Sequence, residues 1–232
     1  MSLDRVAPSH SSATLGRRLF ENGSIVTPAP RRVVVVAPHP DDETLGAGGL
    51  IFDLVRAGSD VSVVVVTDGA ASHPEVADLR SIREAECSRA VAILGVTTPP
   101  EFLGFADGRA QEHVHLIANA LSLLLKRADV VVGPRIDDGH DDHCAVAQAI
   151  EFSCDGPGVV QLRYAIWGWE QLSEQDLKVD CGELFRPSPE ATVAKRRALQ
   201  QYVSQTSDSY GRSIVGHSMV ERAAAEPEVF WS

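Results

Sequence analysis

Two short segments of this sequence gather residue types that bind metals and transfer protons. The first is APHPDDE (residues 37–43), which places an imidazole and three carboxylates within five residues. Imidazole nitrogen and carboxylate oxygen both suit zinc, and the two prolines favour a fixed presentation of the side chains. Adjacent carboxylates point in different directions, so Asp42 can bind a metal while Asp41 addresses a water molecule. A simpler alternative is that one of the two aspartates only caps the following helix.

The second segment is GPRIDDGHDDH (residues 133–143). His140 and His143 are three residues apart and share a face if a helix begins here. Taken alone, this segment is more often an acidic, solvated loop with incidental histidines. Together with the first segment, it can complete a set of metal ligands. His39, Asp42 and His143 together make a set of two nitrogens and one oxygen with an open fourth position, which is typical of a catalytic zinc.

The elements that must position these segments are indicated by three valine-rich runs, at 32–37, 61–66 and 130–132. Continuous β-branched runs of this kind are typical of strands that are buried on both faces. Apolar residues at helical spacing predict helices between and after these runs, at 43–56, 82–94, 113–125 and 192 to about 203. A further strand is expected within 159–169.

The alternation of strands and helices predicts an α/β fold with a mainly parallel sheet. We expect one Rossmann-like domain over residues 32–232, with helices on both faces of the sheet. Residues 1–31 are expected to form an extended or poorly ordered arm. In open parallel sheets, ligands bind at the carboxyl ends of the strands. Both metal-binding segments follow predicted strands directly, so we expect their loops to meet.

Composition narrows the class of protein. The net charge of −11 disfavours nucleic acid as a partner. No apolar run approaches the roughly 20 residues that a membrane span needs, and the first residues lack the apolar core of a secretory signal. These features predict a cytoplasmic protein with a small-molecule substrate. A homo-oligomer is left open.

The two segments, APHPDDE and HDDH (140–143), resemble the PIG-L/LmbE family of zinc-dependent de-N-acetylases. Weaker family-like stretches support the resemblance, namely TDG (67–69), REAE (83–86), LGV (94–96) and AL (198–199) leading to SQ (204–205). Members of the family act on N-acetylglucosaminyl lipids, thiol-cofactor precursors and antibiotic intermediates. Two departures stand out. Asp141 replaces a usual proline, and Tyr202 stands where the family often has histidine, which bears on the substrate pocket.

The resemblance implies one Zn²⁺ per chain, held by the same three residues, His39, Asp42 and His143. The substrate would be an N-acyl compound, such as an acetylated amino sugar. Asp41 would accept a proton from the attacking water. His140 would stabilise the developing oxyanion, oriented by Asp142. Either Asp41 or His140 would then protonate the leaving amine.

Two further residues are candidates for binding the substrate. Arg83 resembles a family position near the substrate, and its guanidinium suits sugar hydroxyls or a phosphate. An ion pair with Glu84 or Glu86 on a helix surface explains Arg83 equally well. Asp107 is a candidate for holding a sugar hydroxyl, although a turn aspartate explains it nearly as well. The tryptophans are expected to belong to the core or to an interface rather than to a sugar-stacking platform: Trp167, Trp169 and Trp231.

Three alternative functions are less consistent with the sequence. A metal-dependent phosphohydrolase also uses His and Asp clusters, but it commonly needs two metals, and only one convincing site can be assembled. A nucleotide-binding module fails because the third glycine of its fingerprint would fall on Ile51. A non-catalytic binding protein of the same fold would tolerate loss of Asp41 or His140, and both are present.

Overall fold

The valine-rich runs form the centre of a five-stranded sheet. The computed structural model describes residues 19–26, 28–154, 158–168, 182–225 and 227–232. All neighbouring strands of this sheet are parallel, in the order β5-β4-β3-β6-β7. The strands are β3 (Arg32–Ala37), β4 (Asp60–Thr67), β5 (Glu101–Phe105), β6 (Val130–Pro134) and β7 (Val160–Tyr164). The predicted α/β class and the predicted mainly parallel sheet are therefore confirmed.

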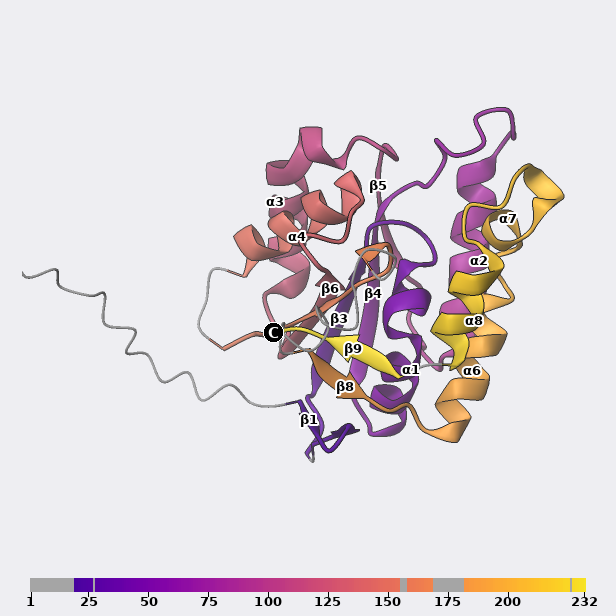
Figure 1. The fold of residues 1–232 in the computed structure, drawn as a ribbon. Coiled ribbons are helices and arrows are strands. Elements are labelled where there is room, and N and C mark those ends of the chain that lie inside the picture. The colour runs from indigo at the N-terminus through magenta and orange to yellow at the C-terminus, as the bar shows by residue number, and fades with distance from the viewer. Residues whose placement is uncertain (1–18, 27, 155–157, 169–181, 226) are drawn as a thin grey trace, which may run out of the picture.

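Helices cover both faces of the sheet because alternate valines of each strand point to opposite sides. Val33 and Val35 pack into one apolar core, and Val34 and Val36 pack into a second. In Figure 1, α3 (Val114–Leu125) and α4 (Asp141–Ser153) lie on one side of the sheet. The helices on the other side are α1 (Asp42–Arg56), α2 (Leu79–Ile93), α6 (Pro189–Leu199) and α8 (His217–Ala225). The described residues also form the short helical turns η1 (Ala110–His113), α7 (Val203–Thr206) and η3 (Asp208–Tyr210).

The order of the strands creates a crevice at the carboxyl ends of the central strands. The chain runs from β3 to β4 and β5 on one side, then returns to add β6 and β7 on the other. The connections therefore diverge between β3 and β6, which pair directly. At such a switch point the loops leave the carboxyl ends of two neighbouring strands in opposite directions, and a ligand crevice opens between them.

The predicted last helix is wrong in its extent. Instead of one helix over 192–203, α6 ends at Leu199, the chain leaves helical angles at Tyr202 (φ −84°, ψ 54°), and α7 starts at Val203. The side chain of Tyr202 is completely buried at this break in the helix. An additional helix, α8, follows. The expected strand within 159–169 is β7, and Trp169 lies outside the described residues.

The predicted arm over residues 1–31 also differs from the structure where it is described. Two short strands, β1 (Phe20–Glu21) and β2 (Ser24–Ile25), pair with each other. Phe20 is buried against Phe185 and Phe230, with ring centroids 5.2 and 5.5 Å away. These two rings belong to a second small sheet of β8 (Glu183–Phe185) and β9 (Glu228–Phe230). Burial of Phe20 explains why this stretch is part of the fold. Residues 1–18 are outside the description.

Helix α1 contains a kink at Ala47 (φ −142°, ψ 16°). A buried ion pair forms hydrogen bonds with the backbone groups that the kink leaves without helical partners. Nζ of Lys195 donates to the backbone oxygen of Leu45 at 2.9 Å and to Glu228 at 2.7 Å. Glu228 accepts the backbone N–H groups of Gly49 and Leu50, at 2.6 and 2.8 Å. The two charges thus replace the helical hydrogen bonds that the kink interrupts.

The residue after β9 pairs with β7, the outer strand of the main sheet. Arg163 of β7 and Trp231 form an antiparallel bridge, with N–H to O distances of 2.7 and 2.9 Å. Among the described helices, none combines the length and apolar character that a membrane crossing requires.

Candidate metal centre and active site

The loops that follow β3 and β6 meet in the crevice between those strands. β3 ends at Ala37 and α1 begins at Asp42, so His39 lies in the connecting loop. α4 begins at Asp141, which places His143 in its first turn. Because β3 and β6 are parallel neighbours, residues about 100 positions apart in the chain come together.

The structure brings His39, Asp42 and His143 into one cluster, with one potential ligand atom from each within 4.8 Å of the others. Oδ2 of Asp42 lies 3.1 Å from Nδ1 of His39 and 3.1 Å from Nε2 of His143. Nε2 of His143 is buried, and its contact with Asp42 lacks the geometry of a regular hydrogen bond. A buried nitrogen of this kind needs a compensating ligand. Two imidazoles and a carboxylate fit a zinc ion, and this nitrogen is directed at Asp42 where the ion would lie.

Carboxylates hold the opposite side of both imidazoles. Nδ1 of His143 contacts Asp138 at 2.7 Å, and Nε2 of His39 lies 3.0 Å from Asp142 and 3.1 Å from Asp107. Metal-binding histidines almost always donate their second N–H to such a partner, which fixes the tautomer and the ring orientation. The presence of this arrangement on both histidines supports the metal centre independently of the ligand set.

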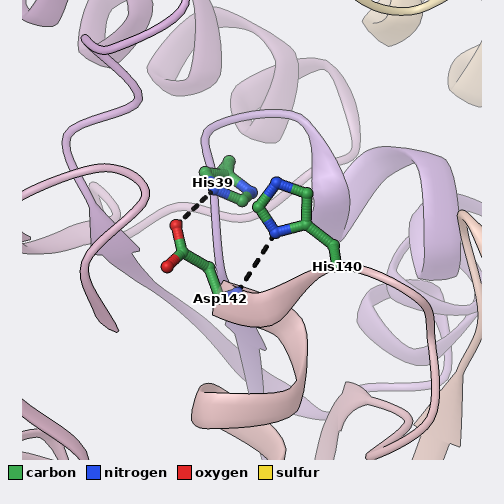
Figure 2. Close-up of side chains that lie close together, drawn as sticks. All are labelled: His39, His140 and Asp142. Carbon is green, nitrogen blue, oxygen red and sulfur yellow. Dashed lines mark hydrogen bonds and ion pairs between the residues drawn. The ribbon is translucent and has the colours of Figure 1, made fainter. Parts of the chain in front are cut away.

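Asp142 contacts two histidines, each through a different group. Figure 2 shows its carboxylate directed at His39, whereas its backbone N–H donates to Nδ1 of His140 at 3.2 Å. The carboxylate also accepts the N–H groups of Gly108 and Ala110, at 2.7 and 2.9 Å. Asp142 therefore holds His140 through its backbone, and its side chain positions His39.

The group drawn in Figure 2, His39 with His140 and Asp142, is a second set whose atoms lie close enough for a metal. It is the weaker candidate. Asp142 already accepts two backbone N–H groups, and Nδ1 of His140 accepts a third as the cap of α4. The first set alone contains a buried nitrogen without a regular hydrogen bond. We therefore assign the candidate metal centre to His39, Asp42 and His143.

His140 lines the cavity beside this centre and is half-buried. Since its Nδ1 accepts the N–H of Asp142, a neutral ring must carry its proton on Nε2. Burial, together with His39 and His143, lowers the pKa of His140 and favours this neutral form. The ring is thus a neutral N–H donor at the edge of the cavity.

The charges in the centre compensate each other. Burial opposes the ionised form of Asp42, but His143 and His39 hold the pKa of that carboxyl well below its usual range. Burial also opposes the charged form of His143, yet Asp42 and Asp138 raise its pKa to about 9. The carboxylates therefore stabilise positive charge at this place, which is the electrostatic condition for a bound cation.

Asp41 is buried at the start of α1, but its side chain does not cap the helix. The capping alternative is therefore excluded for Asp41, and its carboxyl lines the cavity next to His39 and Asp42. The backbone angle φ is 140°, which a residue with a side chain rarely adopts. Burial, followed by the charge of Asp42, raises the pKa of Asp41 well above its usual value.

Arg83 and Asp107 both reach the cavity. Arg83 is 2% exposed, and its Nη2 donates to Oγ of Ser72 at 2.8 Å, while its buried Nε has no hydrogen-bond partner. The surface ion pair is therefore excluded for Arg83, since Glu84 pairs with Arg80 at 2.7 Å. Asp107 accepts the N–H of Ala71 at 2.9 Å in addition to its contact with His39.

The cavity has a volume of about 300 Å³ and a mixed lining. The charged and imidazole groups described above line it together with the apolar residues Leu45, Ile166, Trp167, Ile214 and Val215. Trp167 packs against the main apolar core, as expected, but it is only partly buried and also lines the cavity beside the ring of His140, with centroids 6.3 Å apart.

Sequence reasoning missed Asp138, Trp167 and Gln205 as residues of the site. Asp138 is completely buried and accepts the N–H groups of Ile166 and Gly168, at 2.7 and 2.9 Å, besides its contact with His143. Its position directly after a buried strand was the available signal. Gln205 lines the cavity and belongs to the SQ stretch that supported the resemblance.

The fold and the site define an α/β protein with a candidate metal centre of two histidines and one carboxylate beside a cavity. A family model described as PIG-L: GlcNAc-PI de-N-acetylase matches residues 34–152, and the chain belongs to this family. The matched stretch contains both ligand-bearing loops. Deacetylases of the family are hydrolases that act on amide bonds and depend on a metal.

Curated relatives have matching names. A 1D-myo-inositol 2-acetamido-2-deoxy-alpha-D-glucopyranoside deacetylase of Mycobacterium sp. (strain KMS) is 33% identical over 145 residues, which cover 48% of this chain and 46% of that protein. The uncharacterized deacetylase YaiS of Escherichia coli (strain K12) is 32% identical over 129 residues, covering 53% of this chain and 67% of that protein. The chain spans about half the length of the mycobacterial relative.

Solved structures share the fold. The conserved protein TT1542 from Thermus thermophilus has a TM-score of 0.67 at 26% identity, covering 86% of this chain and 93% of that chain. The N,N'-diacetylchitobiose deacetylase from Pyrococcus horikoshii has a TM-score of 0.63 at 22% identity, covering 78% of this chain and 73% of that chain.

Proposed function

We propose that this chain is a zinc-dependent hydrolase that removes an N-acyl group, acetyl in the simplest case, from an amino sugar or a related metabolite. The observation that carries the proposal is the buried Nε2 of His143, which lies 3.1 Å from the carboxylate of Asp42 without forming a regular hydrogen bond. Nitrogen and oxygen ligands in this ratio, with space left for water and substrate, favour a catalytic zinc. One ion per chain is expected.

The chemistry of the proposed cofactor is simple. When bound by His39, Asp42 and His143, zinc lowers the pKa of a water ligand from about 15.7 to about 7 and polarises the amide carbonyl. Asp142, Asp107 and Asp138 keep the two imidazoles in place, because each accepts a contact from the ring nitrogen that faces away from Asp42.

Asp41 has the role of proton carrier in this proposal. Its carboxyl lines the cavity, is free of capping bonds and adjoins Asp42. It accepts a proton from the attacking water and passes it to the nitrogen of the leaving amine. A positioned acid or base of this kind contributes roughly 10²–10⁴-fold to the rate.

His140 stabilises the charge that develops on the carbonyl oxygen. Its Nδ1 is occupied by the N–H of Asp142, so its Nε2–H remains to donate into the cavity. A neutral donor that is fixed before the reaction loses no energy to reorganisation. This geometry favours Asp41 over His140 as the group that protonates the amine.

The cavity supports a small substrate with both polar and apolar surface. Its volume of about 300 Å³ is at the lower end of ligand pockets, which is enough for about one sugar unit. Arg83 and Asp107 offer a donor and an acceptor to hydroxyl groups, while Trp167 and Ile166 add apolar surface to the lining. The names of the mycobacterial and Pyrococcus relatives, which act on acetylated amino sugars, support the same substrate class.

The test combines metal analysis with amine release from a panel of N-acetylated amino sugars. We expect near-stoichiometric zinc in the wild type and in Asp41→Asn, and a loss of turnover of about 100-fold or more in the variant. Asp60→Asn, an exposed aspartate at the start of β4, is the control. Undiminished amine release from Asp41→Asn would refute the role of Asp41. Release of inorganic phosphate from phosphoesters, without amine release, would refute the function.

A further inference from the structure

The peptide bond between Pro40 and Asp41 is held from both sides. Nε2 of Gln205 donates to the carbonyl oxygen of Pro40 at 2.6 Å. On the other side, the N–H of Asp41 donates to Oε2 of Glu43 at 3.2 Å. Gln205 is 2% exposed and Glu43 is fully buried, so water does not compete for either bond. The two bonds together fix the plane of this peptide.

Glu43 is itself held by neighbours that leave it no alternative position. Its Oε1 accepts a short hydrogen bond from the hydroxyl of Tyr202 and another from Oγ1 of Thr44 at 2.6 Å. Both hydroxyl groups are completely buried and lie 3.1 Å apart. The hydroxyl of Tyr202 therefore acts on the N–H of Asp41 through one intervening carboxylate.

Tyr202 directly precedes α7 and Gln205 lies within it, and this short segment is anchored to α2. Oε1 of Glu86 accepts the N–H of Ser204 at 2.9 Å, and Oε2 accepts its hydroxyl at 2.5 Å. Ser204 and Glu86 are both buried. The anchor fixes the backbone between the two residues that reach the Pro40–Asp41 peptide.

This peptide needs such support because Asp41 has φ 140°, in a region that side-chain-bearing residues avoid. Strained backbone persists only where the surroundings over-determine it. The angle also sets the direction of the Asp41 carboxyl relative to Asp42, since the two residues are adjacent. A relaxed backbone would turn the proton carrier away from its place in the cavity.

We propose that Tyr202 and Gln205 are positioning residues, which clamp the Pro40–Asp41 peptide and thereby aim the Asp41 carboxyl at the reacting atoms. The inference rests on the proposed function, in which Asp41 carries the proton. It explains why a segment far from the metal centre in sequence contributes two buried polar side chains to it. It also gives Tyr202, where the resembled family often has histidine, a specific task as a hydrogen-bond donor.

The test uses Tyr202→Phe and Gln205→Met, which remove only the donors. We expect kcat for amine release to fall about 10- to 100-fold, the effect of misplacing a reacting group by a fraction of an ångström to one ångström, with KM and zinc content unchanged. Tyr164→Phe is the matched control, because it removes another buried tyrosine hydroxyl, which bonds the backbone oxygen of Val36 instead.

A double-variant cycle separates positioning from general damage. In an Asp41→Asn background, Tyr202→Phe should cause no further loss of kcat, because the group that it positions is already disabled. Equal losses in both backgrounds would overturn the clamp. So would an unchanged kcat for both Tyr202→Phe and Gln205→Met.

A second readout does not depend on turnover. The amide proton of Asp41 should exchange with solvent about tenfold faster or more in Tyr202→Phe than in the wild type, and at the wild-type rate in Tyr164→Phe. Unchanged exchange in Tyr202→Phe overturns the clamp even if the wild type shows no amidase activity. Inactivity of the wild type, by contrast, would count against the proposed function alone.

Discussion

Asp138 lies 2.7 Å from Nδ1 of His143, and both side chains are completely buried. The same carboxylate accepts the N–H groups of Ile166 and Gly168 in the loop after β7. Asp138 thus fixes the orientation of the His143 imidazole and is itself held by the loop after β7. Nε2 of the same imidazole faces Asp42. These contacts hold the ring in the orientation that the proposed metal centre requires.

Replacing Asp138 should therefore weaken metal binding. For Asp138→Asn we expect zinc affinity to fall about 10- to 100-fold, because the asparagine no longer fixes the tautomer of His143 or raises its basicity. Competition against a chromogenic chelator measures the affinity. Asp137→Asn is the matched control, since Asp137 is adjacent to Asp138 in sequence but is exposed and pairs with Arg135. Equal affinities in the two variants would contradict the assignment.

His140→Ala should retain zinc but lose turnover. Removing a single oxyanion donor costs about 10²–10³ in kcat, and the assigned metal centre does not include His140. Steady-state amine release and metal analysis on the same sample check both halves of this expectation. His115→Ala, on the exposed face of α3 against Phe152, serves as the control. A parallel loss of zinc in His140→Ala would move this residue into the metal centre.

Arg83→Met should raise KM more than it lowers kcat. The substitution keeps the apolar stem that packs in the buried position but removes a charged donor from the cavity. A hydrogen bond to a charged group contributes about 1.5–3 kcal/mol, which corresponds to a rise in KM of roughly 10- to 100-fold. Arg80→Met removes an exposed arginine from the same helix and should leave KM unchanged. If both variants behave alike, Arg83 does not contact the substrate.

Lys195→Met should destabilise the fold through the kink in α1. It leaves Glu228 buried without its positive partner, a change that typically costs about 3–5 kcal/mol. Arg196→Met breaks only the exposed pair with Glu221 and should cost less than about 1 kcal/mol. Urea unfolding at constant pH measures both values. A small effect in Lys195→Met would show that the kink does not depend on the ion pair.

Much of the fold was predictable because its strands are fully buried and therefore rich in valine. The run at 32–37 coincides with β3, and the loops after it and after β6 were placed at the same edge of the sheet. β5 was not predicted, because its sequence EFLGF is short, contains a glycine and has none of the β-branched residues that mark the other strands. The break after α6 was not predictable either, since it depends on the contact of Tyr202 with Glu43, 159 residues away.

The roles of individual acidic residues were less accessible. Asp137 and Asp138 are identical neighbours in the sequence, yet one pairs with Arg135 at the surface and the other holds His143 in the interior. Similarly, Asp142 is close in sequence to His140, but its carboxylate bonds His39, 103 residues away. Local spacing identifies which residue types gather at a site. The partners of each side chain are set by the packing of distant loops.

The bridge between Arg163 and Trp231 covers part of the open edge of the main sheet. β7 is an outer strand, and exposed outer strands offer unpaired backbone groups to other molecules. Trp231 occupies such groups at Arg163 with two backbone hydrogen bonds, while its ring stacks on the guanidinium of Arg135, 4.3 Å away. Trp231 thus leaves no backbone group of β7 free at Arg163 for pairing with a second strand.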